Sequence, residues 1–301
     1  MSPRQEGRAK MIEIPRLNPV IGALTGGGTA FVTFCPPDPG AAMTIAEAAY
    51  DGVVFEAEHS PYDIRVLKDC FLSLLNRRRI AESGSIAPAV APMVRIPPNG
   101  GEMNQWLAKQ VLDAGAYGVI WPHVSTVEEA RNAVAACRYP RPADSPFFDP
   151  PGIRGDSPRH AARYWGLTQQ EYYGRADTWP LNPKGEILVG IMCEEVRAVR
   201  NLPRMLKEVP GIGVVIIGEG DLSQDLGVPR QYGHASVVSA IADVLAICKE
   251  HGVACGHPHV DKGNVEALVA QGFRWLMPGP VVSHPALEIG RKLAGRATLP
   301  A

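Results

Sequence analysis

The sequence of this 301-residue chain predicts an α/β fold, most simply a single-domain (β/α)8 barrel, the architecture also called a TIM barrel. Short apolar runs of strand type alternate with longer segments of helical pattern along most of the chain. The strand-type runs are continuously apolar, as expected of parallel strands that are buried on both faces. Because eight such units follow one another without a sharp linker, a closed barrel is favoured, and a doubly wound open sheet is the alternative.

The composition narrows the class of protein. Hydrophobic residues make up 46% of the chain, enough for a sizeable core, and the formal net charge is −1. Nucleic acids and anionic membranes favour basic partners, so neither is expected here. The polar N-terminus MSPRQEGRAK lacks a secretion signal, and no apolar stretch approaches the ~20 residues of a membrane span. The six cysteines are scattered without a C-x-x-C pair, which predicts reduced thiols, a cytoplasmic location and no zinc site.

The first four βα units can be followed in order. Their strands are predicted at residues 30–34, 52–55, 93–96 and 117–121. The helix after the first strand is AAMTIAEAAYDG, which would end at a glycine cap, and further helices are predicted near residues 63–76 and 103–114. The fourth helix is STVEEARNAVAAC, where Ser125 or Thr126 would be the N-cap with Glu128 or Glu129 three residues later.

A long segment, residues 138–185, interrupts the alternation. It contains RYPRPADSPFFDPPGIRGD, which is rich in proline, aspartate and glycine, and so long a loop in a compact domain is usually functional or a lid. The alternation resumes with strands predicted at 187–192, 213–217, 253–257 and 274–277, with helices between and after them. The predicted organisation is a polar extension over residues 1–18 and one barrel domain over residues 19–301, with the long loop after the fourth βα unit.

Polar side chains directly follow most of the apolar runs. The active site of such a barrel lies at the carboxyl ends of its strands. The residues predicted to gather there are Glu56, Glu58, His59, Arg95, His123, Glu194, Glu219, Asp221, His257 and His259. An ordinary charged loop would explain one such strand end well, but it explains five or six converging ends poorly. These residues therefore predict a shared polar cavity.

Two of these carboxylates form a candidate metal site. Glu194 and Asp221 are 27 residues apart, which is one βα unit, so they would follow adjacent strands. Two carboxylates leave coordination positions for water and a bidentate substrate, as is usual for Mg²⁺ or Mn²⁺. A zinc site would more often show three His or Cys ligands. The alternative is a capping glutamate and a turn aspartate, because Asp-Leu-Ser also suits a helix N-terminus.

His59 and Arg95 also have more than one interpretation. His59 is a candidate general base, metal ligand or structural histidine, and a neighbouring carboxylate would orient its ring and stabilise the imidazolium. Arg95 ends an apolar strand, where an unpaired guanidinium is not expected. It would either stabilise a developing oxyanion or pair with Glu56 or Glu58.

Taken together, these segments resemble the HpcH/HpaI aldolase/citrate lyase family, in its metal-dependent, pyruvate-forming class II aldolase branch. The resemblance covers about residues 19–287. It is carried in this order by EAEHSPYD (56–63), MVRIP (93–97), LDAGA (112–116), PHVSTVEEAR (122–131), RYP (138–140) with GIRG (152–155), and GEGDLS (218–223). Any one of these motifs alone would be weak, but the combination is highly specific.

The resemblance implies a fold, a chemistry and an assembly. Members of the family are (β/α)8 barrels, commonly hexamers built as trimers of dimers. They cleave or form a C–C bond beside a pyruvate enolate held on a divalent metal, with a small oxo-acid and an aldehyde as reactants. No organic cofactor and no lysine Schiff base are expected.

The resemblance also implies roles for individual residues. It implies that Glu194 and Asp221 are the metal ligands, that His59 is the catalytic histidine with Asp113 as its partner, and that Arg95 contacts the pyruvate oxygen. The backbone amides around Gly220 and Asp221 would hold the substrate carboxylate at a helix N-terminus. These expectations concern one site at the carboxyl ends of the strands.

This sequence departs from the family pattern at three positions close to that site. Glu56 stands where Asp is usual, Met192 where Gln is usual, and Glu219 where Pro is usual. The region around residues 79–90 and the Phe-Phe-Asp-Pro segment at 147–150 are also atypical.

Two other functions therefore stay open. One is another enolate-type lyase on the same scaffold, such as an acyl-CoA lyase or a decarboxylating C–C bond former. The other is a non-catalytic barrel that binds an oxo-acid.

Overall fold

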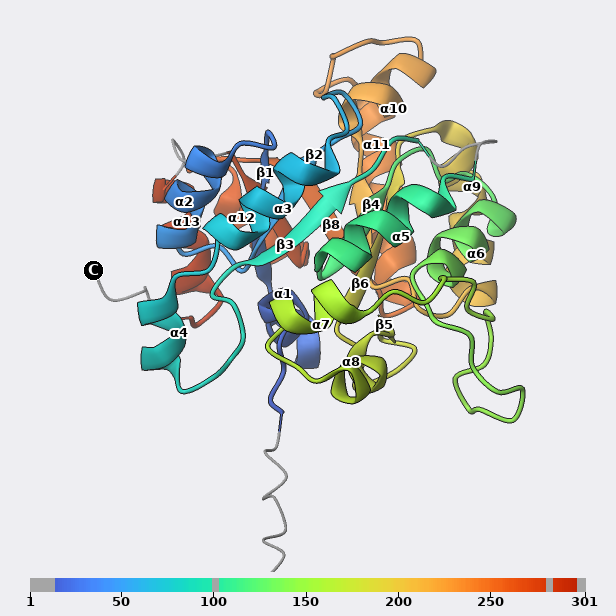
Figure 1. Cartoon of the computed structure of the whole chain (residues 1–301). Coiled ribbons are helices and arrows are strands. Elements are labelled where there is room, and N and C mark those ends of the chain that lie inside the picture. Colours follow the sequence, from blue (N-terminus) through green and yellow to red (C-terminus); the bar gives the residue numbers. More distant parts are fainter. Residues whose placement is uncertain (1–13, 99–102, 280–283, 297–301) are drawn as a thin grey trace, which may run out of the picture.

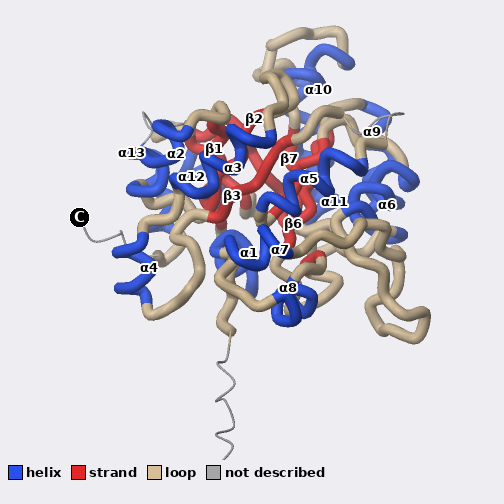
Figure 2. Tube along the Cα trace, in the orientation of Figure 1, coloured by secondary structure: helices blue, strands red, loops and turns tan. Residues whose placement is uncertain are grey.

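The strands close into one parallel barrel. The computed structural model describes residues 14–98, 103–279 and 284–296. The strands are β1 (Ala30–Cys35), β2 (Gly52–Glu56), β3 (Ala91–Arg95), β4 (Gly118–Trp121), β5 (Thr178–Trp179), β6 (Ile187–Cys193), β7 (Val214–Ile217), β8 (Ala254–Val260) and β9 (Trp275–Pro278). Strand β1 pairs with β9, and β4 pairs with β6, so eight of them form a ring (Figure 2). The predicted (β/α)8 barrel is confirmed, and the open-sheet alternative is wrong.

Each of the eight predicted strands overlaps a strand of the ring. Strand β5 was not predicted. It is a short parallel partner of β6, in which Thr178 and Trp179 pair with Ile187 and Leu188. Its two residues lack the apolar run that marks the other strands, so the sequence pattern contains no signal for it.

Helices surround the ring (Figure 1). They are α2 (Pro39–Glu47), α3 (Ile64–Ser73), α4 (Arg77–Ser83), α5 (Gln105–Ala114), α6 (Val127–Ala136), α9 (Val196–Glu208), α10 (Glu219–Asp225), α11 (Ala235–Glu250), α12 (Val265–Gln271) and α13 (His284–Leu293). The capping box predicted for the fourth helix is present, because the Thr126 side chain accepts from the Glu129 N–H and the Glu129 carboxylate accepts from the Thr126 N–H.

The predicted glycine cap of the first of these helices is wrong. Helix α2 ends at Glu47, and its C-cap Ala48 has an extended backbone. The Asp51 carboxylate accepts a hydrogen bond from the backbone N–H of Phe31 and pairs with Arg296, which draws the chain straight into β2. Gly52 is needed there because a Cβ would lie 2.6 Å from Val20 Cγ2 and 2.7 Å from Met93 Cε.

The chain before β1 closes the amino-terminal end of the ring. Helix α1 (Pro19–Leu24) lies below the strands in Figure 1 and is followed by a 3-10 turn (Thr25–Gly27). The buried Asn18 caps α1 with its side-chain oxygen, and its Nδ2 donates to the carbonyls of Tyr117 and Glu186. Packing against the barrel therefore begins before Pro19. Of the predicted extension, residues 1–13 lie outside the described residues.

The long segment 138–185 also lies at the amino-terminal end. It forms α7 (Arg159–Tyr164), α8 (Gln169–Arg175) and β5. The fully buried Arg138 donates from Nε to Asp177 at 2.6 Å, and Trp165 stacks on Tyr117 with ring centroids 4.3 Å apart. These contacts anchor the segment beside the start of β4. It is therefore not a lid over the carboxyl ends of the strands.

All six cysteines are buried free thiols. Among the described residues, no helix combines the length and the apolarity that crossing a bilayer would require.

Candidate active site

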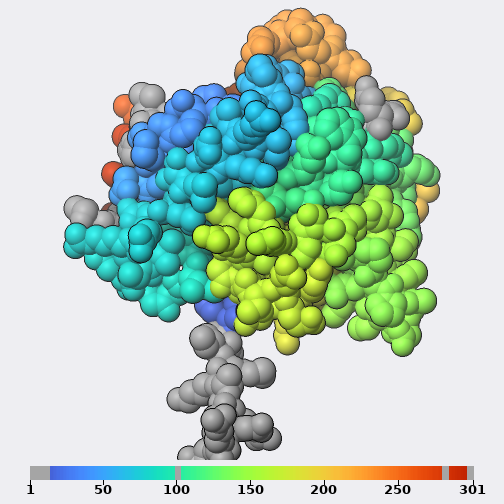
Figure 3. Space-filling view, in the orientation of Figure 1, coloured from blue at the N-terminus to red at the C-terminus, as the bar shows by residue number. Residues whose placement is uncertain are grey.

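A pocket of about 390 Å³ opens at the carboxyl ends of the strands. It lies between the ends of β1, β3, β6, β7, β8 and β9 and the first turn of α10, which stands above the ring in Figure 1 and forms the highest part of the surface in Figure 3. Its polar lining includes Arg95, Glu194, Glu219, Asp221, Arg230 and His259. Five of the ten side chains predicted to share a cavity line this pocket, including both candidate metal ligands. The other five are not part of its lining, namely Glu56, Glu58, His59, His123 and His257.

Arg95 lies between two carboxylates of the neighbouring strand. Its Nε donates to Glu56 Oε2 at 2.8 Å, and a second nitrogen pairs with the same oxygen. Its third nitrogen lies 2.9 Å from Glu58 Oε2. The guanidinium also sits over the Phe34 ring, 4.7 Å from the centroid. Arg95 is thus held by charge and by stacking, with its edge toward the pocket that it lines.

Glu56 shapes the loop that carries His59. The other oxygen of Glu56, Oε1, accepts hydrogen bonds from the backbone N–H groups of Glu58 at 2.6 Å and His59 at 3.0 Å. The His59 side chain is 68% exposed, and its Nε2 lies 3.6 Å from Glu58 Oε2. His59 therefore stands at the open edge of the site with a carboxylate neighbour.

Asp113, the partner that the family resemblance assigns to His59, does not lie beside it in this chain. Asp113 is at the end of α5, where its Oδ1 accepts from the buried Arg154 at 2.8 Å. Burial raises the pKa of Asp113, and the charge of Arg154 opposes that rise. Because α5 runs back toward the start of β4, this pair lies at the amino-terminal end of the barrel. Within one chain the carboxylate beside His59 is Glu58, and the pairing of His59 with Asp113 stays a prediction.

Glu194 is the most enclosed acid of the site. It directly follows β6 and is 1% exposed. Its Oε1 accepts from the backbone N–H of His123 at 2.6 Å. Burial raises the pKa of Glu194 to about 7, although the His123 amide and ring oppose that rise. A cation bound beside this carboxylate would favour its ionised form.

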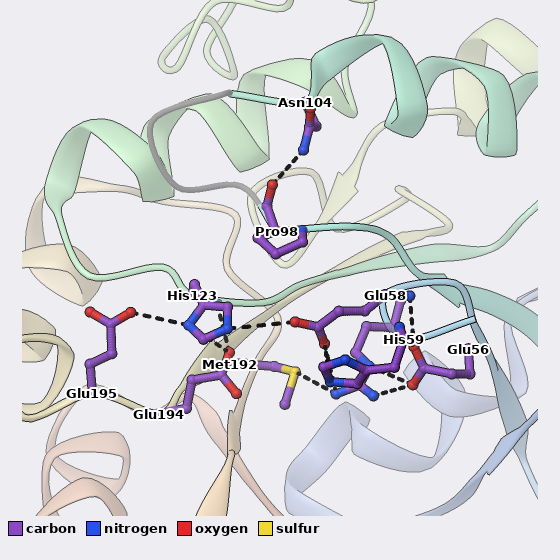
Figure 4. Close-up of polar contacts among 10 residues, drawn as sticks. Glu56, Glu58, His59, Pro98, Asn104, His123, Met192, Glu194 and Glu195 are labelled. Atoms are coloured by element: carbon purple, nitrogen blue, oxygen red, sulfur yellow. Dashed lines mark hydrogen bonds and ion pairs between the residues drawn. The ribbon is translucent and has the colours of Figure 1, made fainter. Parts of the chain in front are cut away.

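His123 links three acids (Figure 4). Its Nδ1 lies 3.1 Å from Glu195 Oε1, and its Nε2 lies 3.6 Å from Glu58 Oε1. The backbone of His123 has a φ of 53°, which turns the residue out of the strand direction after β4. Burial would lower the pKa of His123, but Glu194, Glu195 and Glu58 together raise it.

The sequence places His123 after a strand but gives no sign of this central position. The PHV motif could have indicated that His123 belongs to the site, because a histidine directly after a barrel strand reaches the same rim as the acids. Glu58 is predicted from the sequence as a strand-end acid and as one of two possible partners of Arg95, without a further role. Its burial, with 4% of the side chain exposed, raises its pKa and makes it the shared neighbour of Arg95, His59 and His123.

The donor set suits a hard divalent cation. Glu194 and Asp221 line the same pocket, and the charge of Asp221 acts on both Glu194 and His123. Arg95 is already paired with Glu56 and Glu58, so its charge is not available to balance Glu194 and Asp221. Across the described ranges, no three or more His, Cys, Asp or Glu side chains are grouped to hold a metal by themselves. Two carboxylates with open positions match Mg²⁺ or Mn²⁺ better than zinc.

Gly218 allows Glu194 to occupy its position. A Cβ built on Gly218 would lie 2.5 Å from Glu194 Cβ and would overlap the carboxylate. Its φ of −99° is open to any residue, so the demand for glycine here is steric. The ends of β6 and β7 can therefore approach each other this closely because residue 218 is glycine and has no side chain.

We predict that Gly218→Ala displaces the Glu194 carboxylate and weakens Mn²⁺ binding by roughly 10–100-fold, the usual effect of disturbing the support of a metal ligand. Titration calorimetry of the folded variant measures this. Gly174→Ala on α8 is the control, because no atom lies within 4 Å of the added carbon. Unchanged Mn²⁺ affinity in a folded Gly218→Ala protein would contradict the prediction.

Comparison with known proteins agrees with this geometry. Residues 31–279 match the HpcH/HpaI aldolase/citrate lyase family. The chain is 31% identical over 249 residues to the 2-keto-3-deoxy-L-rhamnonate aldolase of Klebsiella pneumoniae, covering 83% of this chain and 81% of the relative. It is 28% identical over 255 residues to the hydroxypyruvate/pyruvate aldolase of Roseobacter denitrificans, covering 85% and 87%.

A solved structure shows the same fold. A HpcH/HpaI aldolase/citrate lyase family protein from Burkholderia cenocepacia superimposes with a TM-score of 0.71 at 26% identity, covering 92% of this chain and 97% of that one. The curated relatives are aldolases, which are carbon–carbon lyases. The chain therefore belongs to the HpcH/HpaI aldolase/citrate lyase family, and it is a carbon–carbon lyase of the aldolase type.

Proposed function

We propose that the protein is a metal-dependent class II aldolase. It would form or cleave the C–C bond between a pyruvate enolate and an aldehyde, so that the substrate of cleavage is a 4-hydroxy-2-oxo acid. The observation that supports this most strongly is the pairing of Glu194 and Asp221, which follow consecutive ring strands and line one pocket with Arg95. Relatives named for pyruvate support the choice of nucleophile.

Glu194 and Asp221 would hold the cation, Mg²⁺ or Mn²⁺. When bound, it supplies Lewis-acid stabilisation of negative charge on the substrate oxygens. The backbone amides of Gly220 and Asp221, which lie in the pocket wall, are proposed to hold the substrate carboxylate. These interactions would orient the oxo-acid with its reactive end toward Arg95.

Arg95 is proposed to stabilise the developing enolate oxygen. Its guanidinium stays charged at any working pH, and Glu56 and Glu58 hold its plane in place before substrate arrives. Such a preorganised donor costs no reorganisation when charge develops. Met192, whose sulfur lies 3.7 Å from the Arg95 nitrogen next to Glu58, supports the guanidinium only weakly, because a thioether is a weak acceptor.

His59 is proposed as the base that removes the proton from the 4-hydroxyl group in the cleavage direction. Glu58 takes the orienting role that the resemblance gave to Asp113, because it is the carboxylate beside the ring. The exposed position of His59 allows proton exchange with solvent between turnovers. The oligomeric state, a hexamer by resemblance, stays a prediction.

The two other functions can be separated from this one. An acyl-CoA lyase or a decarboxylating C–C bond former would share the enolate chemistry but would not release pyruvate from a 4-hydroxy-2-oxo acid. A non-catalytic barrel would bind an oxo-acid without exchanging its protons. Incubating the Mn²⁺-loaded protein with candidate 4-hydroxy-2-oxo acids, and following pyruvate release, tests the proposal directly.

We predict that chelation with EDTA abolishes pyruvate release and that Mg²⁺ or Mn²⁺ restores it. Glu194→Gln should lower restored activity by about 100-fold or more, since Lewis-acid stabilisation is worth several kcal/mol. Glu208→Gln, an exposed acid on α9, is the matched control. Full activity of the chelated wild-type protein would contradict metal dependence.

We predict that Arg95→Lys and Arg95→Ala both lose exchange of the pyruvate methyl protons with deuterated water, by about 10²–10³-fold. NMR measures this exchange, which needs the enolate but no aldehyde. Arg95→Lys is the more informative variant, because lysine keeps a positive charge for Glu56 and Glu58 but lacks the planar guanidinium that would contact the enolate oxygen. Retained exchange with lost aldol cleavage would place Arg95 on the acceptor side instead.

We predict that His59→Ala lowers kcat for aldol cleavage by roughly 10²–10⁴-fold, the usual contribution of a general base, with Mn²⁺ affinity unchanged. Steady-state kinetics and calorimetry measure the two quantities. His160→Ala, an exposed histidine on α7, is the control. Cleavage within a few-fold of wild type would show that His59 is structural.

A further inference from the structure

A buried acid and two histidines form a second polar cluster, made of Glu219, His257 and His259. Glu219 is 5% exposed at the start of α10. Its Oε2 accepts a hydrogen bond from His259 Nδ1, and its Oε1 lies 3.3 Å from His257 Nε2. Both histidines come from β8. None of the three residues has a role in the aldolase chemistry proposed for the other side chains.

The two histidines differ in what they face. His259 lines the pocket that contains the candidate metal ligands, whereas His257 is outside that lining. The His259 side chain is 57% exposed, and the His257 side chain is 11% exposed. Because Nδ1 of His259 is bonded to Glu219, its other ring nitrogen, Nε2, is the one that can meet a bound substrate. His259 can therefore exchange protons with both a substrate and the solvent.

His259 lies across the barrel from Arg95. The ring order is β1, β2, β3, β4, β6, β7, β8 and β9, so the strand of His259 is four places from β3, which ends in Arg95. The oxygen and the methyl group of pyruvate leave C2 in different directions. An oxo-acid whose C2 oxygen points toward Arg95 therefore directs its methyl carbon, C3, away from Arg95, toward the half of the wall formed by β8, β9 and β1.

That half of the wall contains one group suited to proton transfer. Apart from His259, the described residues of β8, β9 and β1 that line the pocket are Thr33, Phe34, Pro258, Met277 and Pro278. Of these side chains, an imidazole alone titrates near neutral pH. His259 is therefore the candidate for any proton transfer at C3.

The surroundings of His259 favour its protonated form. The hydrogen bond with Glu219 raises the pKa of His259, whereas burial and the charge of Arg230 oppose that rise. The Tyr232 ring packs on the imidazole with ring centroids 5.1 Å apart. Burial lowers the pKa of His257, so a positive charge beside Glu219 is favoured on the histidine that faces the pocket.

Aldol cleavage requires proton transfer at two different atoms. The 4-hydroxyl group loses its proton as the C3–C4 bond breaks, and His59 is the base proposed for that step. The electron pair of the broken bond remains in the enolate, whose C3 must then gain a proton to give pyruvate. No residue has been assigned to this second transfer.

We propose that His259 protonates C3 of the pyruvate enolate and, in the reverse direction, removes a methyl proton. The inference rests on the proposed aldolase function and adds a catalytic residue to it. In cleavage, the Nε2–H bond of the imidazolium breaks, the electron pair of the enolate double bond forms the C3–H bond, and the C2 carbonyl is restored. Neutral His259 then takes a proton from solvent. Glu219 is a positioning residue, because its hydrogen bond fixes the ring with Nε2 toward the substrate.

The test is the exchange of pyruvate methyl protons with deuterated water, followed by NMR with the Mn²⁺-loaded full-length protein. His259→Asn keeps an amide that can bond to Glu219 but removes Nε2. We expect this variant to lower exchange by roughly 10²–10⁴-fold, the usual contribution of a general acid or base, with Mn²⁺ affinity unchanged. His257→Asn is the matched control, because His257 contacts the same carboxylate from outside the pocket lining, and it should exchange within a few-fold of wild type.

Glu219→Gln tests the positioning role by a second measurement. Removal of a methyl proton needs the neutral imidazole, so exchange slows as the pH falls below the pKa of His259. Because Glu219 raises that pKa, Glu219→Gln should shift the low-pH fall in exchange to lower pH. A purely structural role would lower exchange at every pH without moving the profile, and an unmoved profile would contradict the assignment.

Two further results would overturn the inference. One is wild-type exchange in His259→Asn whose folding is verified by thermal unfolding. The other is an equal loss of exchange in His259→Asn and His257→Asn, which would show that the cluster only joins α10 to β8. Pyruvate release by wild type together with undiminished exchange in His259→Asn refutes this inference alone. Wild type that neither exchanges nor releases pyruvate refutes the proposed aldolase function with it.

Discussion

Closure of the parallel ring is the constraint on which the site depends. Strand β1 pairs with β9 and β4 pairs with β6, so every strand delivers its carboxyl end to the same rim. Glu56 and Arg95 come from the neighbouring strands β2 and β3, but Glu194 follows β6, which would lie far from β3 in an open sheet of the same order. The apolar strands that bury the ring thus also determine which polar groups share a cavity.

The cavity then separates charge. On one side, Glu56 and Glu58 hold Arg95, and Glu194 and Asp221 line the same pocket, an arrangement that favours a bound cation. On the other side, the buried Glu219 accepts a hydrogen bond from His259 and lies 3.3 Å from His257.

The amino-terminal end of the barrel has a structural role. Asn18 joins α1 to the starts of β4 and β6, and Arg138, Arg154 and Trp165 anchor the long segment after α6. These side chains are buried and bonded, as polar groups in a core must be. The stability of the ring and the chemistry of its rim are therefore located at opposite ends, so that the rim can carry unbalanced charge.

The sequence by itself determined the barrel, the positions of its strands and the pairing of Glu194 with Asp221. These follow from local patterns, since apolar runs mark strands and one βα unit always brings two strand ends together. It did not determine which side chains touch across the cavity. Asp113 bonds to Arg154 at the far end of the barrel, and His123 lies among three acids because its backbone has a positive φ. Glu219 contacts His257 and His259 on β8, and 40 positions of sequence separate Glu219 from His259. Such contacts depend on the stagger of the ring and on burial, which only the tertiary structure decides.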